Sequence, residues 1–305
     1  MDFKFTDPAA SPEEPLKVVF SGSYEDTPDI KELFIEDGIE EIAENAFRNF
    51  ENLEIVHFPK SLRQISACAF AGCKNLKSVD MNFGLAEILD EAFSSCPSLS
   101  SVIIPDSVKR IGFGAFEGCA SLTKLKLSES VLMIGANAFA FCFNLRDVTI
   151  PDSCILVEFC AFSHCFSLES VKLSDNMGLI DDCTFEGCRS LSVVDMPVRL
   201  KKIGRRVFAG CTSLRSLILP VGTASIGLDA FVGCSSLSRI AIPKNMMELE
   251  DTELFAGCDS LTEISFGGDE ALFENLTRGR AITVQRSDLS LFTPKITFMD
   301  LKDEI

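Results

Sequence analysis

The chain of 305 residues has no tryptophan, a single tyrosine and only two histidines, His57 and His164. Two histidines leave little material for histidine-based catalysis or for a histidine-rich metal site. No Walker loop, G-x-S-x-G elbow or H-E-x-x-H motif occurs in the sequence. We therefore predict that the protein is not an enzyme and uses no cofactor.

Long apolar runs are also missing. None reaches the ~18 residues that a membrane-spanning helix requires, so we expect no insertion into a membrane. The amino end, MDFKFTDPAASPEEP, has neither a basic segment nor an apolar segment of a secretory signal. These features predict a cytoplasmic location. The alternative is the cell surface, reached by an unrecognised route, where the sequon at Asn275 would be open to glycosylation.

What the sequence does have is a repeat. Its 26 phenylalanines include a series in which the first eight steps are 23 residues each and the last is 24. A period of this length is the signature of a repeat architecture in which neighbouring copies share one core. The series is Phe47, Phe70, Phe93, Phe116, Phe139, Phe162, Phe185, Phe208, Phe231 and Phe255.

Other positions keep the same phase. Three residues after each phenylalanine stands a cysteine, except in the first copy, where Phe50 fills the place. A leucine follows at six residues and an aliphatic residue at nine, so the unit is I-G-x-x-A-F-x-G-C-x-x-L-x-x-V-x-I-P. The V-x-I part alternates as a half-buried strand does. The A-F-x-G-C part spaces its apolar residues by three, which favours a short helical or 3-10 turn.

The repeated octets AFAGCKNL, AFEGCASL, VFAGCTSL and AFVGCSSL, with VIIPDSVKRIG between copies, resemble the BspA-like (Treponema pallidum type) leucine-rich repeats. The resemblance covers about residues 30–266. It implies an α/β solenoid, a right-handed superhelix of about ten 23-residue repeats with a parallel concave sheet and short helical or 3-10 convex turns. It also implies a role in adhesion or partner binding, as in most members of the family.

Both ends depart from the period, as the caps of a solenoid must. We predict an acidic N-terminal cap at 1–29, the solenoid at 30–266 and a C-terminal cap at 267–305. GGDEALFENLTRG predicts a short helix in the second cap, followed by two closing strands in ITVQRS and KITFMDL. Residues 1–52 have 14 acidic and 4 basic side chains and residues 248–305 have 13 and 5, so the formal net charge of −17 belongs to the ends. An acidic chain of this kind is a poor ligand for nucleic acid.

The 13 cysteines raise the question of redox or metal chemistry. Nine of them share one repeat phase, beside the core phenylalanine, which favours reduced thiols packed as small apolar groups. A departure from the phase crowds Cys154, Cys160, His164, Cys165 and Cys183 into two adjacent repeats. Stacked thiols beside one imidazole are the alternative here, as the start of a zinc site.

In a solenoid, the strand side chains that point away from the core form a broad ordered surface. We expect a centrally basic concave face with acidic borders, suited to a protein partner that is itself acidic. A second basic cluster, from Arg199 to Arg215, and the two caps are alternative binding surfaces. The concave candidates are His57, Asp80, Lys124, Lys126, Arg146, Asp147, Lys172 and Asp195.

The function that these features favour is a non-catalytic protein–protein interaction module, or scaffold, that binds a protein partner through the concave face of the solenoid. Two alternatives remain beside it. One is a cell-surface adhesin of the same repeat family, and the other is a structural component of a larger assembly.

Overall fold

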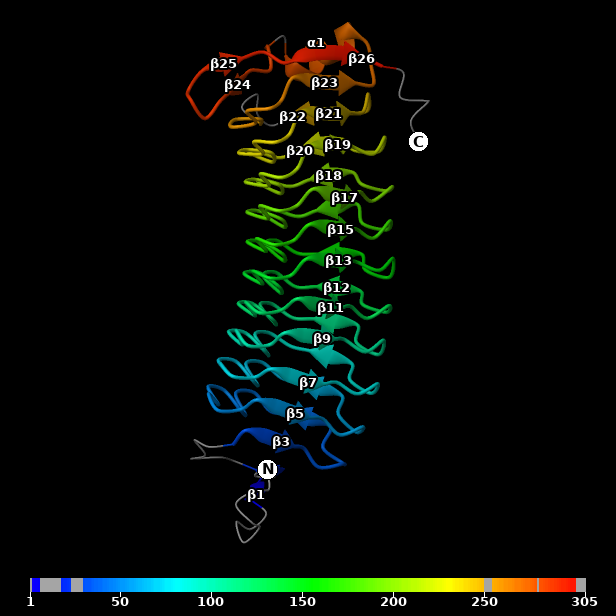
Figure 1. Ribbon diagram of the computed structural model, residues 1–305. Coiled ribbons are helices and arrows are strands. Elements are labelled where there is room, and N and C mark those ends of the chain that lie inside the picture. Colours follow the sequence, from blue (N-terminus) through cyan, green and yellow to red (C-terminus); the bar gives the residue numbers. More distant parts are fainter. Residues whose placement is uncertain (1, 6–17, 23–29, 250–253, 279, 300–305) are drawn as a thin grey trace. The chain divides into compact units, whose positions relative to one another are not determined.

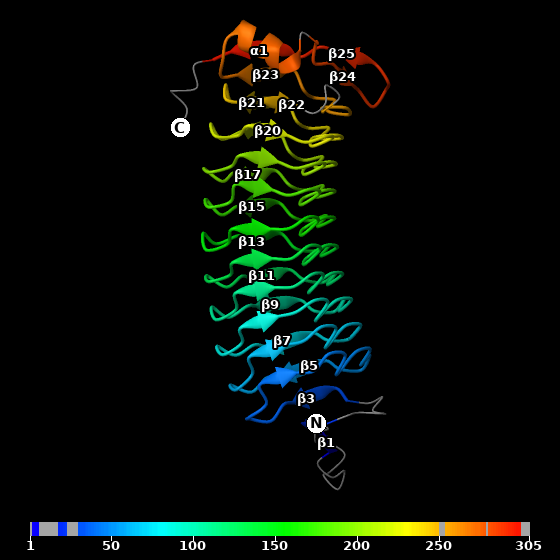
Figure 2. The same ribbon diagram turned by 180° about the vertical axis from the view of Figure 1, so that it is seen from behind.

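The computed structural model describes residues 2–5, 18–22, 30–249, 254–278 and 280–299. The chain divides into two compact units, residues 1–146 and 147–305. Within each unit, the repeat builds a parallel-strand solenoid in which every coil is one copy of 23 residues, or of 24 in the last step. Figure 1, and Figure 2 from behind, show the strands of successive coils lying above one another with turns at the side.

The first unit contains two parallel sheets. Longer strands come from V-x-I and form a five-stranded sheet in the order β11-β9-β7-β5-β3, and two-residue strands come from the segment around I-G. An antiparallel pair, β1 (Asp2–Phe5) and β2 (Val18–Gly22), precedes them. The longer strands are β3 (Glu32–Phe34), β5 (Ile55–His57), β7 (Ser78–Asp80), β9 (Ser101–Ile103) and β11 (Lys124–Lys126), and the short ones are β4 (Glu41–Ile42), β6 (Gln64–Ile65), β8 (Glu87–Ile88), β10 (Arg110–Ile111) and β12 (Met133–Ile134).

The second unit repeats this plan, but its longer strands form two sheets. One has the order β13-β15-β17 and the other β19-β21-β23-β26, while short strands pair as β16-β18-β20-β22. The longer strands are β13 (Asp147–Thr149), β15 (Ser170–Lys172), β17 (Val193–Asp195), β19 (Ser216–Ile218), β21 (Arg239–Ile242), β23 (Glu263–Phe266) and β26 (Lys295–Phe298), and the short ones are β14 (Leu156–Val157), β16 (Leu179–Ile180), β18 (Lys202–Ile203), β20 (Ser225–Ile226) and β22 (Glu248–Leu249).

The closing elements follow β23. The helix predicted in the C-terminal cap is confirmed as α1 (Glu270–Thr277), whose N-cap Asp269 accepts the N–H of Leu272 at 2.9 Å. An antiparallel pair, β24 (Val284–Gln285) and β25 (Leu291–Phe292), precedes β26, which extends the parallel sheet beside β23. The unit therefore ends with a paired strand on its longer sheet.

The repeated phenylalanines form the core. Each ring is fully buried, and within each unit the rings of successive coils stack on one another. In the first unit the ring centroids from Phe47 to Phe139 are 5.0 to 5.3 Å apart, and in the second unit those from Phe162 to Phe255 are 5.7 to 5.9 Å apart. Burial of a phenylalanine contributes about 1.5–3 kcal/mol, so this column supplies much of the cohesion between coils.

The turns differ from the prediction. Among the described residues α1 is the only α-helix, and the A-F-x-G-C segments are successive hydrogen-bonded turns, so the expected helical or 3-10 turns are not confirmed. The reason is a pair of left-handed residues in each turn that is described in full, such as Cys68 (φ 54°) and Gly72 (φ 75°), which interrupt helical geometry. Amides alternate in their acceptors: Ala71 N–H closes a turn on Cys68 O at 3.1 Å, whereas Phe70 N–H reaches Ala92 O of the next coil at 2.8 Å. The right-handed sense of the solenoid stays a prediction.

Candidate functional site

The outward side chains of the longer strands are the first candidate surface, here called the long-strand face of each unit. In these strands the central residue is turned inward, as in β13, where Val148 is buried between exposed Asp147 and Thr149. Parallel pairing in register places equivalent residues of successive coils side by side. Each column of outward side chains is therefore held on an ordered backbone.

In the first unit, His57 and Asp80 are neighbours in register on β5 and β7. His57 is already engaged, because its Nε2 lies 2.9 Å from Oε1 of Glu32 and its ring stacks on Phe34 with centroids 4.4 Å apart. These contacts give His57 a packing role at the first coils. Asp80, in contrast, is exposed.

Three cations of the first unit are more available. Lys124 and Lys126 are the two outward residues of β11, and both are exposed, as is Arg146. No ion pair found within the described part of the chain involves any of the three. Their charge is therefore left for solvent or for a partner.

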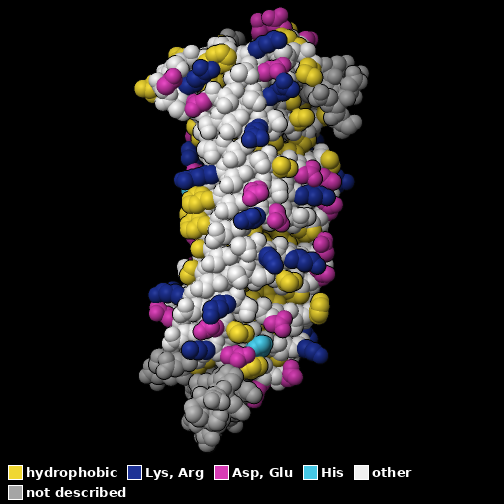
Figure 3. Space-filling model, in the orientation of Figure 1, with side chains coloured by type: hydrophobic (Ala, Val, Ile, Leu, Met, Phe, Trp, Pro, Cys, Tyr) yellow, Lys and Arg dark blue, Asp and Glu magenta, His cyan; other side chains and the backbone are white. Residues whose placement is uncertain are grey.

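The three candidates of the second unit lie on adjacent strands. Asp147 is opposite Ser170, and Lys172 is opposite Asp195, so an exposed cation and an exposed anion are cross-strand neighbours. On the face that Figure 3 presents, Lys and Arg side chains are interspersed with Asp and Glu and with apolar side chains. The long-strand surface is thus mixed in charge at the scale of single residues.

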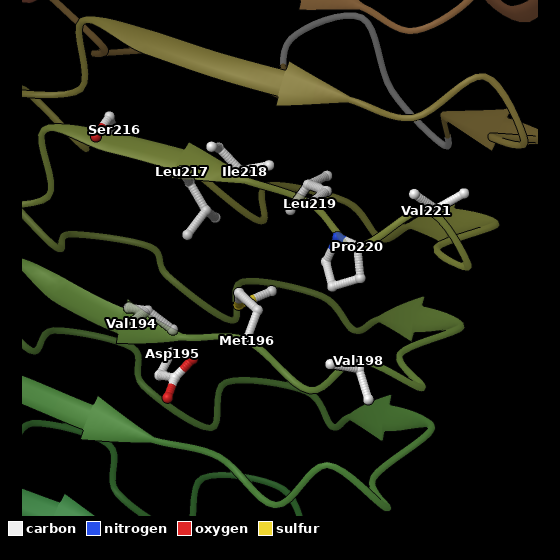
Figure 4. A pocket seen from close by; sticks show the side chains of 10 residues that line it. All are labelled: Val194, Asp195, Met196, Val198, Ser216, Leu217, Ile218, Leu219, Pro220 and Val221. Atoms are coloured by element: carbon white, nitrogen blue, oxygen red, sulfur yellow. The ribbon is translucent and has the colours of Figure 1, made fainter. Parts of the chain in front are cut away.

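A hollow in the second unit was not predicted from the sequence (Figure 4). Its volume is about 550 Å³. Asp195 is the one predicted site residue among those that line the hollow. The other lining residues could have been suspected from Val198 and Val221. These two valines occupy a turn position at which other coils have an aspartate: Asp106, Asp152 and Asp175. The lining residues are Val194, Asp195, Met196, Val198, Ser216, Leu217, Ile218, Leu219, Pro220 and Val221.

The second basic cluster is partly paired. Arg206 Nη2 lies 2.7 Å from Glu186 Oε1 and Arg206 Nη1 lies 3.5 Å from Asp229 Oδ2. Burial alone would raise the pKa of Glu186, but hydrogen bonds from Arg206 and Cys183, together with the charge of Arg206, outweigh it and hold that pKa below its ordinary value. Arg206 is therefore engaged by the turns of the two neighbouring coils.

The cysteines in phase with the repeat are buried thiols. Each of eight donates its S–H to the carbonyl of the core phenylalanine one coil earlier, as Cys73 Sγ does to Phe47 O at 3.2 Å and Cys234 Sγ to Phe208 O at 3.0 Å. None of the 13 cysteines, all of which lie in the described ranges, forms a disulfide bond. The eight donors are Cys73, Cys96, Cys119, Cys142, Cys188, Cys211, Cys234 and Cys258.

The structure gives no support to a metal centre at the cysteines that lie outside the repeat phase, such as Cys160 and Cys183. Burial raises the pKa of the Cys183 thiol to about 12, and both Glu186 and Cys160 contribute to the rise. A high pKa disfavours the thiolate that zinc requires. Within the described ranges no group of three or more His, Cys, Asp or Glu side chains is placed to hold a metal ion, so the zinc alternative gains no support.

No helix in the described part of the chain is long and apolar enough to cross a membrane. The stacked coils, phenylalanine column and leucine positions define a leucine-rich-repeat solenoid. A family model described as "BspA type Leucine rich repeat region (6 copies)" matches residues 17–146 and 157–276. The chain belongs to this family.

Three solved structures illustrate the likeness. A leucine-rich repeat protein from Bacteroides ovatus is 24% identical, with 98% of each chain covered and a TM-score of 0.49. A leucine rich cell surface protein from Faecalibacterium prausnitzii is 28% identical over 81% of this chain and 82% of its own, with a TM-score of 0.44. The T. pallidum leucine rich repeat protein is 27% identical over 70% of this chain and 87% of its own, with a TM-score of 0.47. No curated protein matches significantly.

Proposed function

We propose that this chain is a non-catalytic interaction module, or scaffold, that binds a protein partner through the long-strand face, which we expect to be concave. The observation that carries the proposal is the set of exposed cations, Lys124, Lys126 and Arg146, which have no ion pair among the described residues. Membership of a leucine-rich-repeat family supports it, since such repeats present extended binding surfaces.

The expected partner is acidic where it meets β11. Unpaired lysines on a rigid strand attract a complementary surface and contribute mainly to its association rate and specificity. Lys172 and Asp195 on the second unit add one charge of each sign, so the partner should be mixed in charge there. Together these columns favour a folded protein or a peptide over nucleic acid, since the chain has a formal net charge of −17.

The test is affinity purification from the cells in which the protein occurs. We expect Lys124→Glu/Lys126→Glu to lose the partner that the unaltered chain retains. Lys109→Glu/Arg110→Glu is the matched control, because Lys109 and Arg110 are exposed cations of the same unit and Arg110 belongs to the two-residue strand β10. Both variants should keep the thermal transition of the parent. Retention of the partner by the β11 variant, or its loss from both variants, would overturn the proposal.

The compartment of this interaction needs its own measurement. The cytoplasm stays a prediction, which the comparisons do not support, and one of the similar structures is called a cell surface protein. Alkylation of the protein from its native source, without prior reduction, distinguishes a cytoplasmic from a cell-surface location. Thirteen alkylated cysteines after unfolding are expected for a cytoplasmic protein, whereas a disulfide or a glycan on Asn275 would assign it to the cell surface.

A further inference from the structure

The long-strand sheet of the second unit is interrupted between β17 and β19. The three-stranded sheet ends at β17 and the four-stranded sheet begins at β19. On either side of the interruption, Leu173 N–H bonds to Asp195 O and Leu219 N–H bonds to Ala241 O, each at 3.0 Å. No bond of this kind among the described residues joins the intervening pair, Met196 and Ile218.

The interruption is local, because the same two coils stay joined elsewhere. Phe185 N–H donates to Val207 O at 3.0 Å and Gly187 N–H donates to Ala209 O at 2.7 Å in the turns. The short strands β16, β18 and β20 also form one sheet. The coils therefore part at the long-strand face alone, and the hollow of about 550 Å³ lies there.

The hollow is apolar and open. Val193 beside it and three of its lining residues are exposed to unusual degrees for aliphatic side chains: Val193 by 59%, Val198 by 66%, Ile218 by 54% and Val221 by 37%. Figure 4 shows Met196 and Pro220 reaching into it from opposite sides. Asp195 is the one charged side chain among the lining residues. Contiguous exposed aliphatic surface of this kind marks an interaction site more often than an ordinary surface.

In other turns an aspartate accepts a hydrogen bond from the backbone N–H of the equivalent residue in the next coil, and this series ends at Val198. Asp152 Oδ1 accepts the N–H of Asp175 at 3.0 Å, and Asp175 Oδ1 accepts the N–H of Val198 at 3.3 Å. Val198 has no carboxylate to offer Val221. The same substitution that ends this series thus supplies apolar wall to the hollow.

We propose that the hollow between β17 and β19 binds an extended segment of the protein partner, with aliphatic side chains at alternate positions and a lysine or arginine beside Asp195. The lining runs along the strands, from Val194 to Val198 on one side and from Ser216 to Val221 on the other. An extended occupant fits this direction, and the separated strand edges offer it backbone groups, as in binding by strand addition. Charge complementarity with Asp195 selects a basic side chain over an acidic one.

This inference rests on the proposed function, since it names the chemistry of part of the same partner. Its test uses the whole chain as bait for a displayed library of random dodecapeptides. We expect enrichment of peptides with alternating Val, Ile or Leu and one basic residue. Enrichment of no peptide over an empty surface, or of acidic or wholly polar peptides, would overturn it.

The discriminating variant is Val198→Asp/Val221→Asp. Aspartate occupies this turn position in other coils, so the fold should tolerate it, while the charges repel an aliphatic occupant. We expect the enriched peptides to bind this variant at least roughly tenfold more weakly. The matched control is Phe83→Asp, at the same position of a coil in the first unit, where Phe83 is 88% exposed. It should bind the peptides as the parent does.

The outcomes separate the two proposals. If the β11 variant loses the native partner but Val198→Asp/Val221→Asp leaves peptide binding unchanged, the proposed function stands and the hollow is not its site. If the peptides bind and the β11 variant retains the native partner, the hollow is confirmed as a peptide-binding site and the proposed role of Lys124 and Lys126 in partner binding is wrong. Concentration-dependent dimerisation that Val198→Asp/Val221→Asp abolishes, without peptide binding, would assign the hollow to a second copy of the chain and overturn the inference.

Discussion

At the scale of single residues, the cysteine beside each core phenylalanine has a double role. Its side chain fills a small apolar space, and its S–H satisfies the phenylalanine carbonyl of the preceding coil, as Cys119 Sγ does to Phe93 O at 3.4 Å. Alanine would fill less space and donate nothing, and serine would bury a more polar group. This accounts for a cysteine at the same place in coil after coil.

Burial raises the pKa of the Cys119 thiol to about 12, far above the ~8.5 of an exposed thiol. Stability from this group is therefore complete below about pH 8.5 and is lost as pH rises towards 12, because only the unfolded chain ionises there. We predict that the free energy of unfolding falls between pH 8 and pH 10 by about 2 kcal/mol for this thiol alone. Urea unfolding at the two pH values measures it.

The control for this prediction is Cys119→Ala, which removes the titrating group. The variant should be less stable than the parent at pH 8, yet should lose less stability on transfer to pH 10. An equal loss in both proteins would contradict the argument. The burial of these cysteines could be predicted from their phase, but their hydrogen bonds to carbonyls could not, because they depend on turn geometry.

At the scale of elements, the turn position two residues after the phenylalanine requires left-handed backbone. Gly210 has φ 73° there, and a Cβ added to it would approach Gly187 Cα at 3.7 Å, an ordinary contact. Strain in the backbone is thus the main cost of a substitution. We predict that Gly210→Ala lowers the free energy of unfolding by about 1 kcal/mol, and Gly210→Asn by less, since asparagine adopts this conformation more readily. Chemical denaturation measures both.

The matched control is Gly178→Ala. Gly178 is not in the left-handed region, and a Cβ added to it meets nothing within 4 Å. This variant should be as stable as the parent or slightly more stable, because alanine restricts the unfolded chain. Equal destabilisation at both positions would show that the left-handed requirement is not the cause.

The elements were predictable to the extent that they repeat with alternation. V-x-I predicts the longer strands, as in β9 (Ser101–Ile103) and β13 (Asp147–Thr149). The second sheet was missed, although Ile65, Ile88 and Ile111 recur at the 23-residue period, because two-residue strands contain no alternation to detect. The turns were misjudged because a spacing of three fits both a helix and a series of hydrogen-bonded turns.

At the scale of the whole molecule, a repeat predicts what is common to the coils, and the candidate site lies where one coil differs. The hollow depends on an interruption between β17 and β19 that no residue spacing announces. Its sequence signal, Val198 and Val221 in place of aspartate, becomes meaningful only after those turns are known to lie beside each other. The cationic candidates were easier, because outward strand positions follow directly from the alternation.

A solenoid also makes a prediction about length. Each coil contacts mainly its neighbours, so removing one complete period should leave the remaining contacts in place. We predict that deletion of 71–93, which is 23 residues of the first unit, gives a protein with a cooperative thermal transition and the same type of far-ultraviolet circular dichroism. The deletion joins Phe70 to the segment ending in Cys96, so cysteine again follows phenylalanine by three residues.

Deletion of 72–93 is the control, because it keeps Ala71 and places that cysteine four residues after Phe70. The extra residue falls inside a turn in which alternate N–H groups bond within the turn and to the next coil. A shift by one residue would exchange these two kinds of acceptor. It would also move the cysteine thiol away from the carbonyl to which it donates. The 24-residue step before Phe255 is compatible with this, since the spacing from Phe255 to Cys258 is unchanged. We expect the free energy of unfolding of the control to fall by several kcal/mol, or the control to fail to fold. Equal thermal transitions in the two deletions would contradict this, and would mean that the turns, unlike the strands, tolerate a change of register.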